Sequence, residues 1–461
     1  GYPELHVLDT TDPTAILRIE NRIEIETTVF IVSSKSGTTI ETASLQRYFE
    51  ERMRDATGET ITLDNFIAIT DPDTILYEQA KEDGYHRVFV NPPDIGGRYS
   101  ALSFFGLVPA AIIGVDVERL LLEANALNHE EGFVLGAGLA EFALEGRDKL
   151  TFLPSRGFES FGAWAEQLIA ESTGKQGKGL VPIDGEPLGQ PAVYGNDRVF
   201  VHLGDGAPDA SIAALEAAGH PVLPIAVTDP YQIGREFLRW EIATATIGAA
   251  LGINPFDEPN VQESKDNTRH VLEEYIRSGN MPDSEVIAED GDLALHAGPA
   301  TLRLLGAADR SVAGLVGALF QSGAPGRYAA IMAYLWRSEE HDCSLAELRT
   351  AVRDATRMAT TVGYGPRFLH STGQLHKGGP ATGIFLQITV DDPTDEDIPG
   401  GPGFGFSALK AAQAAGDLLA LESRGRPSLR VHIRGDVTAG LRRLASGVEA
   451  ALSPRTAAVQ E

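Results

Sequence analysis

Residues 26–42, with the sequence ETTVFIVSSKSGTTIET, decide the fold of this chain. Residues 29–32 are four consecutive apolar residues and predict a short buried strand, and a helical apolar/polar pattern starts near Glu41. The turn between them, residues 33–39, holds five serines and threonines, and Gly37 permits a tight bend. Free N–H groups at a helix N-terminus and side-chain hydroxyls all donate hydrogen bonds to anions. We therefore predict that this turn, called the cradle below, binds a phosphate or a phosphosugar.

Helix capping is the alternative explanation for the hydroxyls of the cradle. Glu41 follows Thr38 by three residues, which is the spacing of a capping box. One serine or threonine is enough for a cap, however, and the cradle has five in seven residues. The excess favours anion binding, and capping remains the alternative.

Short apolar runs alternate with helical patterns along the whole chain. The expected strands cover residues 4–8, 29–32, 66–70, 87–90, 151–155, 199–203, 221–225, 328–336, 367–369, 383–389 and 428–434. This alternation predicts βαβ units, mostly parallel sheets and an α/β fold. Ligands of such folds bind beyond the C-terminal ends of the strands, which is where the cradle lies.

The length of 461 residues exceeds that of one ordinary domain. We predict a first lobe over residues 1–147 and a second over residues 148–277. Residues 278–326 are acidic and have little regular pattern, so we expect a linker or excursion there. A C-terminal α/β portion is expected over residues 327–461.

Charge and composition exclude several classes of protein. The formal net charge of −27 at pH 7 repels nucleic acid and anionic membranes, so neither is an expected partner. We find no apolar run of the ~18 residues that a membrane span needs and no signal peptide. The single cysteine, Cys343, excludes an internal disulfide, and with only His341 and Asp342 beside it we expect no metal site. The expected compartment is the cytosol.

Five side chains outside the cradle are candidates for chemistry, each with a structural alternative. Arg98 follows two glycines at a helix entrance and could clamp an anion or pair with an acid. Glu171 ends a helix, where an acid opposes the dipole, and could be a general base or a surface residue. Lys265 could be one more solvated lysine. His370 and His376 share one loop after an expected strand, where functional and structural roles are equally plausible.

Four separate stretches resemble the phosphoglucose isomerase family of sugar isomerase (SIS) domains. They are SKSGTTIET at 34–42, GGRYS at 96–100, ESTGK at 171–175, and GINPFD at 252–257 followed by Lys265. The resemblance covers about residues 5–275. It implies two three-layer α/β/α lobes with mostly parallel sheets, besides the C-terminal portion. It also implies isomerisation of glucose 6-phosphate to fructose 6-phosphate through a cis-enediol, without a cofactor or metal.

The resemblance implies a role for each matching residue. Glu171 would move the proton between C1 and C2, Arg98 would stabilise the enediolate, and Lys265 would contact the region of the ring oxygen. His370 would open the ring, with His376 as the second possibility. The implied substrate-binding residues are Ser34, Lys35, Ser36, Thr38, Thr39, Thr42, Gly97 and His376.

The chain departs from the family pattern in two places. The family histidine precedes the lysine, whereas the segment HSTGQLH at 370–376 follows Lys265. The family's glycine-rich GxGGS loop would lie before Leu5, so we expect a chain cut from a longer one. The C-terminal half resembles the isomerase portion of fused transaldolase/phosphoglucose isomerase proteins. A phosphorylated hexose substrate and a homodimer are implied; the alternatives are a non-catalytic phosphosugar-binding module and an isomerase that also accepts mannose 6-phosphate.

Overall fold

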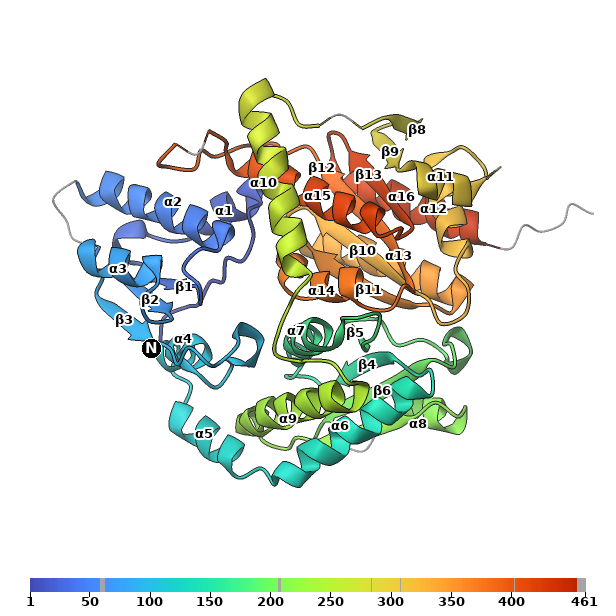
Figure 1. Ribbon diagram of the computed structural model, residues 1–461, viewed down its shortest axis with the longest axis horizontal. Coiled ribbons are helices and arrows are strands. Elements are labelled where there is room, and N and C mark those ends of the chain that lie inside the picture. The colour runs from blue at the N-terminus through green and yellow to red at the C-terminus, as the bar shows by residue number, and fades with distance from the viewer. Residues whose placement is uncertain (59–62, 206–208, 283, 307, 402, 454–461) are drawn as a thin grey trace, which may run out of the picture.

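The computed structural model describes residues 1–58, 63–205, 209–282, 284–306, 308–401 and 403–453. Within these ranges the chain forms three β-sheets covered by helices, and most neighbouring strands are parallel (Figure 1). The predicted α/β class with mostly parallel sheets is therefore confirmed. No helix in the described ranges is both long enough and apolar enough to cross a bilayer.

The first sheet carries the cradle. Its strands β1 (Phe30–Ser33), β2 (Phe66–Thr70) and β3 (Arg87–Val90) are parallel and lie in that order. Helices α1 (Pro13–Glu20), α2 (Ile40–Thr57) and α3 (Ile75–Glu82) accompany it. Residues 4–8, expected as a strand, are irregular. Leu5 and Val7 of that segment are exposed.

The second sheet is four-stranded, parallel and ordered β5-β4-β6-β7. The strands are β4 (Lys149–Pro154), β5 (Val181–Ile183), β6 (Arg198–Gly204) and β7 (Val222–Ala226). Around it lie α6 (His129–Leu144), α7 (Phe161–Thr173), α8 (Ala210–Ala217) and α9 (Ile233–Leu251), and Leu168 and Trp240 are fully buried in its core. The connection from the first sheet runs through η2 (Gly97–Tyr99), α4 (Phe104–Ile112) and α5 (Val117–Asn125).

The third sheet is six-stranded and ordered β11-β10-β12-β13-β9-β8. The strands β10 (Tyr328–Tyr334), β11 (Ala359–Tyr364), β12 (Gly383–Val390) and β13 (Ser428–Ile433) are parallel. Its helices include α13 (Glu339–Thr356), α15 (Phe406–Ser423) and α16 (Val437–Leu452).

Residues 278–326 contain regular elements where a linker was expected. They form β8 (Val286–Asp290), β9 (Leu293–Ala297), α11 (Pro299–Leu305) and α12 (Val312–Gln321), and both strands extend the third sheet antiparallel. The acidic composition misleads because β8 is an edge strand, so Glu289 and Asp290 face solvent while Leu293 and Leu295 are buried. The domain boundaries themselves stay a prediction.

Two further helices lie between the C-terminal portion and the first two lobes. Helix α10 (Val261–Ser278) packs against α15 and stands between the first sheet and the C-terminal sheet (Figure 1). Residues 367–369, expected as a strand, belong to η5 (Arg367–His370), because Pro366 precedes them and favours a helical turn. The next helix, α14 (Gly373–Gly378), packs on α7. The histidine segment is thereby held against the helix that carries Glu171.

Candidate active site

The cradle is a tight, internally bonded turn between β1 and α2. Gly37 has a φ of 67°, and a Cβ at this position would lie 3.0 Å from a backbone nitrogen of α3, so the turn needs glycine. Ser34 Oγ donates to Thr39 Oγ1 at 3.3 Å and accepts from Gly37 N at 3.1 Å. The hydroxyls of Ser36 and Thr38 lie 3.0 Å apart. Five hydroxyl groups are thus concentrated at the positive end of the α2 dipole.

The capping box considered for Thr38 and Glu41 is not formed. Thr39 is the N-cap residue of α2, and its side chain makes no capping hydrogen bond. Glu41 instead turns toward the C-terminal lobe, where it accepts a hydrogen bond from Gln413 Nε2 at 2.7 Å. Capping therefore does not explain the hydroxyls of the cradle.

Lys35 has a partner within the chain. Its Nζ forms an ion pair with Asp71 and donates to the carbonyl of Pro93 at 2.8 Å. These contacts join the cradle to the loops after β2 and β3. The ammonium group therefore fixes the position of the cradle, and Asp71 neutralises its charge.

Glu41 and His370 form a hydrogen-bonded ion pair between the first and the C-terminal lobe. Their Oε1 and Nε2 atoms are 2.9 Å apart. Burial would raise the pKa of Glu41, but the hydrogen bond and charge of His370 outweigh it and lower that pKa. Burial would lower the pKa of His370, but Glu41 outweighs it and raises that pKa, while the charge of Lys265 opposes the rise. The pair therefore favours a protonated imidazole.

Arg98 connects the second lobe to the turn before α10. Its Nε donates to Ser172 Oγ at 2.7 Å, and Nη2 donates to the carbonyls of Pro255 at 2.8 Å and Asp257 at 3.0 Å. Nη1 lies 3.5 Å from Glu171 Oε1. The guanidinium group is buried, and these contacts hold it rigidly beside Glu171.

Glu171 lies at the C-terminal end of α7 with its side chain 12% exposed. Burial raises its pKa, and Arg98 and a 3.3 Å hydrogen bond from Gln167 Nε2 oppose part of the rise. A carboxylate with a raised pKa can accept and return a proton near neutrality. The helix position and the burial thus both suit Glu171 to general base chemistry.

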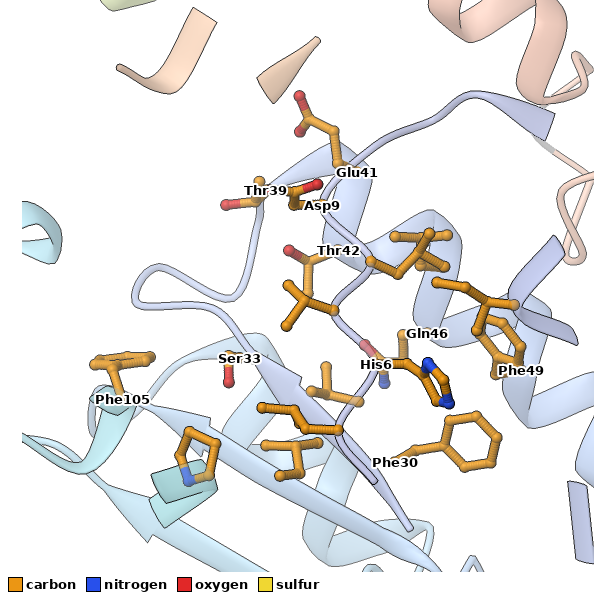
Figure 2. Close-up of a pocket in the computed structure, with 18 of the residues that line it drawn as sticks. His6, Asp9, Phe30, Ser33, Thr39, Glu41, Thr42, Gln46, Phe49 and Phe105 are labelled. Carbon is orange, nitrogen blue, oxygen red and sulfur yellow. The ribbon is translucent and has the colours of Figure 1, made fainter. Parts of the chain in front are cut away.

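Two cavities meet at Thr39, Glu41 and His370. The first, of about 660 Å³, is also lined by Ser33, Thr42, Gln167 and Ser371. Figure 2 shows Thr39 and Glu41 at one end of this cavity and the rings of Phe30 and Phe49 at another, so most of its wall is apolar. The second, of about 550 Å³, lies between α2 and α10 and is lined by Thr38 and Lys265 among others. Gln167, which bonds to Glu171, connects the first cavity to the Arg98–Glu171 pair.

His376 lies apart from these groups. It is 2% exposed and is surrounded by the rings of Tyr328, Phe368 and Phe385. Within the described residues its two ring nitrogens have no hydrogen-bond partner. His376 lines neither cavity, and its role as a substrate-binding residue stays a prediction. His370, six residues earlier, lines both cavities.

We predict that His376→Leu weakens the pH dependence of stability. Burial lowers the pKa of His376 well below its usual 6.5, so below pH 6.5 the unfolded chain binds a proton that the folded chain does not. The free energy of unfolding should then fall by up to about 1.4 kcal/mol per pH unit as the pH drops through this range. Urea unfolding at pH 7 and pH 5 measures the loss, which the leucine variant should reduce and the control His129→Gln, at an exposed site, should not. Equal losses in all three proteins would contradict the prediction.

Four functional candidates were missing from the predicted set. Glu41 sits within the cradle motif but was considered only as a capping residue. Gln167, Glu258 and Gln413 have no distinctive local pattern, and only their contacts with Glu171, Arg98 and Glu41 identify them.

The predicted substrate-binding residues divide into two groups by their place relative to the cavities. Thr38, Thr39 and Thr42 line one or both cavities. The residues of the second group do not line them, and they are Ser34, Lys35, Ser36, Gly97 and His376. Among the described residues no cluster of three His, Cys, Asp or Glu side chains could hold a metal ion.

Comparison with known proteins adds independent findings. A family model described as phosphoglucose isomerase matches residues 2–134. Glucose-6-phosphate isomerase of Mycoplasmopsis pulmonis is 32% identical over 296 residues, which are 52% of this chain and 69% of that protein. Probable glucose-6-phosphate isomerase of Haloquadratum walsbyi is 35% identical over 317 residues, 59% of this chain and 73% of that protein. The crystal structure of a hypothetical protein from Thermus thermophilus matches with a TM-score of 0.52 at 27% identity, covering 58% of this chain and 77% of that one.

Proposed function

This chain belongs to the phosphoglucose isomerase family, and on that premise we propose that it interconverts glucose 6-phosphate and fructose 6-phosphate. The observation that supports the proposal most is the Arg98–Glu171 pair, a buried base beside a fixed cation. Both residues lie within motifs that resemble the family. The relatives named glucose-6-phosphate isomerase support the same reaction.

The cradle would hold the phosphate group of the substrate. Ser36, Thr38 and Thr39 supply hydroxyl donors, Ser34 orients the hydroxyl of Thr39 by a hydrogen bond, and the first N–H groups of α2 add the positive end of the helix dipole. In a chain with a net charge of −27, such a local site is needed to attract an anionic sugar. Anchoring the phosphate fixes the position of the sugar carbons and so lowers the entropic cost of reaction.

His370 would open the sugar ring. The hydrogen bond and charge of Glu41 raise the pKa of His370 against the effect of burial. The imidazole can therefore donate a proton to the ring oxygen of the sugar. Lys265, on α10, lines the second cavity together with His370 and would contact the same region of the sugar. We place His370 rather than His376 in this role.

Glu171 would carry out the isomerisation itself. It takes the proton from C2 of the open-chain aldose, and the electrons shift to form the cis-enediolate. Arg98 stabilises the negative charge that develops on oxygen. Glu171 then returns the proton to C1 while a proton moves from O2 to O1, which gives the ketose. C1 is reduced while C2 is oxidised within the same molecule, so the step balances without an external oxidant or reductant.

A coupled assay tests this function. Purified protein is supplied with fructose 6-phosphate, and the glucose 6-phosphate formed is oxidised by an added dehydrogenase whose NADPH is measured. We expect turnover. Phosphosugar binding without turnover would instead support a non-catalytic module, and a parallel assay with mannose 6-phosphate tests the wider substrate range. A homodimer, a cytoplasmic location and an upstream transaldolase stay predictions, which sedimentation, cell fractionation and the neighbouring coding sequence can test.

We predict that Thr39→Val raises the KM for fructose 6-phosphate by about tenfold or more, the size expected for one hydrogen bond to a charged group. Valine keeps the shape of threonine but cannot donate to the phosphate, and kcat should change less than KM. Thr57→Val, at the far end of the same helix, is the matched control, because its hydroxyl bonds only within α2. A change in kcat with an unchanged KM would contradict the role of the cradle.

A further inference from the structure

One nitrogen of Arg98 faces two carboxylates. Nη1 donates to Glu258 Oε2 at 3.0 Å and lies 3.5 Å from Glu171 Oε1. Glu258 follows the turn at residues 252–257 and approaches the guanidinium group from the α10 side, whereas Glu171 approaches from α7. The arrangement is a carboxylate–guanidinium–carboxylate triad with a net charge of −1.

The remaining N–H groups of Arg98 are already used. A guanidinium group has five N–H donors. Nε binds Ser172 Oγ, and Nη2 binds the carbonyls of Pro255 and Asp257, which belong to a fixed turn. The two N–H groups of Nη1 are left for Glu171 and Glu258. An oxyanion that binds Nη1 must therefore compete with Glu258, which accepts a hydrogen bond there, and with Glu171, whose carboxylate lies 3.5 Å away.

Glu258 is the acceptor that can leave at the lowest cost. Its side chain is 48% exposed, whereas that of Glu171 is 12% exposed. A half-exposed carboxylate that releases Arg98 regains water at once, and a surface ion pair contributes little stability. Displacing Glu171 would instead remove the proposed base, and displacing the backbone carbonyls would break the turn.

We propose that Glu258 competes with the substrate for Arg98. In the free protein the carboxylate of Glu258 occupies the N–H group that the enediolate oxygen takes during the reaction. It is a positioning residue, because it acts through Arg98 and not on the reacting atoms. The inference rests on the proposed isomerase function. We therefore expect the free protein to bind enediolate-like anions less tightly than it would if Glu258 did not contact Arg98.

Glu258 also acts on the proton affinity of Glu171. The groups that face Glu171 are Arg98 from η2, His370 from η5, Gln167 on the same helix and Glu258. Burial raises the pKa of Glu171 first; Arg98, Gln167 and His370 oppose the rise, and Glu258 adds to it. Removing the negative charge of Glu258 should thus lower the pKa of Glu171. Because the base acts when deprotonated, the acid limb of kcat/KM should move to lower pH.

Calorimetric titration with arabinonate 5-phosphate tests the proposal without requiring turnover. The carboxylate of this probe carries the charge of the enediolate beside an anchored phosphate. We expect Glu258→Gln and Glu258→Ala to lower its Kd by about two- to fivefold, the strength of a half-exposed ion pair. The control Glu263→Gln removes the same charge from a residue bound to Arg424, away from Arg98, and should leave Kd unchanged.

The outcomes separate the two proposals. A Kd that is unchanged or higher in both Glu258 variants overturns the competitor role, whatever the activity of the protein. Absence of turnover in the unmodified protein, with tighter probe binding in the variants, overturns the isomerase function but keeps the competition for Arg98. If both proposals hold, Glu258→Gln also shifts the acid limb of kcat/KM to lower pH, which a purely structural role would not do.

Discussion

Glu171→Gln is expected to lower kcat for the isomerisation of fructose 6-phosphate by about 10²–10⁴-fold, the contribution of a general base. The amide keeps the size and the hydrogen-bonding shape of the side chain, but it cannot accept a proton from carbon. Phosphosugar binding depends on the cradle, on another lobe, and should change only a few-fold. Steady-state kinetics together with calorimetric binding of the product separate the two effects.

The control for this variant is Glu216→Gln, which removes an exposed charge from α8 of the same lobe. It should leave kcat and KM unchanged. The pH profile provides a second check, because burial raises the pKa of Glu171. Activity that requires the deprotonated base is then lost on acidification at a higher pH than an ordinary glutamate would give. Near-normal turnover of Glu171→Gln would disprove the assignment.

His370→Asn is expected to produce the second large loss, about 10²-fold in kcat, because asparagine cannot transfer a proton to the ring oxygen. The loss should be smaller for an analogue that cannot form a ring, since such a substrate needs no opening. Comparing ring-forming and open-chain substrates by initial rates measures this difference. An equal loss for both substrates would assign His370 to another step.

Glu41, the partner of His370, should also affect the pH dependence of ring opening. Burial lowers the pKa of His370, and the hydrogen bond and charge of Glu41 raise it to above its usual value. An acid acts while protonated, so activity is lost as the pH rises through this raised pKa. In Glu41→Gln the charge that raises the pKa of His370 is lost, so the alkaline limb of kcat should move to lower pH. Glu51→Gln, at an exposed site on the same helix, is the matched control, because it removes the same charge and lies outside both cavities.

Local sequence was sufficient for the cradle and for the fold class. A strand, a hydroxyl-rich turn and a helix are contiguous there, so their geometry follows from neighbouring residues. The Glu41–His370 pair could not be found in this way, since the two residues are 329 positions apart and belong to different lobes, on α2 and in η5. For the same reason a motif that placed two histidines in one loop could not tell which of them faces the site.

Composition misled in one further place. The acidic residues of 278–326 suggested a linker, although Leu293 and Leu295 on β9 are buried in the third sheet. Both strands are short, and β8 is the edge strand, where Val286, Glu289 and Asp290 are exposed. An averaged charge over 49 residues therefore concealed the short buried apolar run at residues 293–295.

The sequence separation of 329 residues between Glu41 and His370 also determines when the pair can form during synthesis. A ribosome that adds 5–20 residues per second needs roughly 15–65 s to reach the histidine after it has made the glutamate. During that interval the nascent chain carries the cradle and, later, Glu171, but no acid for ring opening. Among the proposed catalytic groups, His370 is thus the last to be synthesised, after Arg98, Glu171 and Lys265.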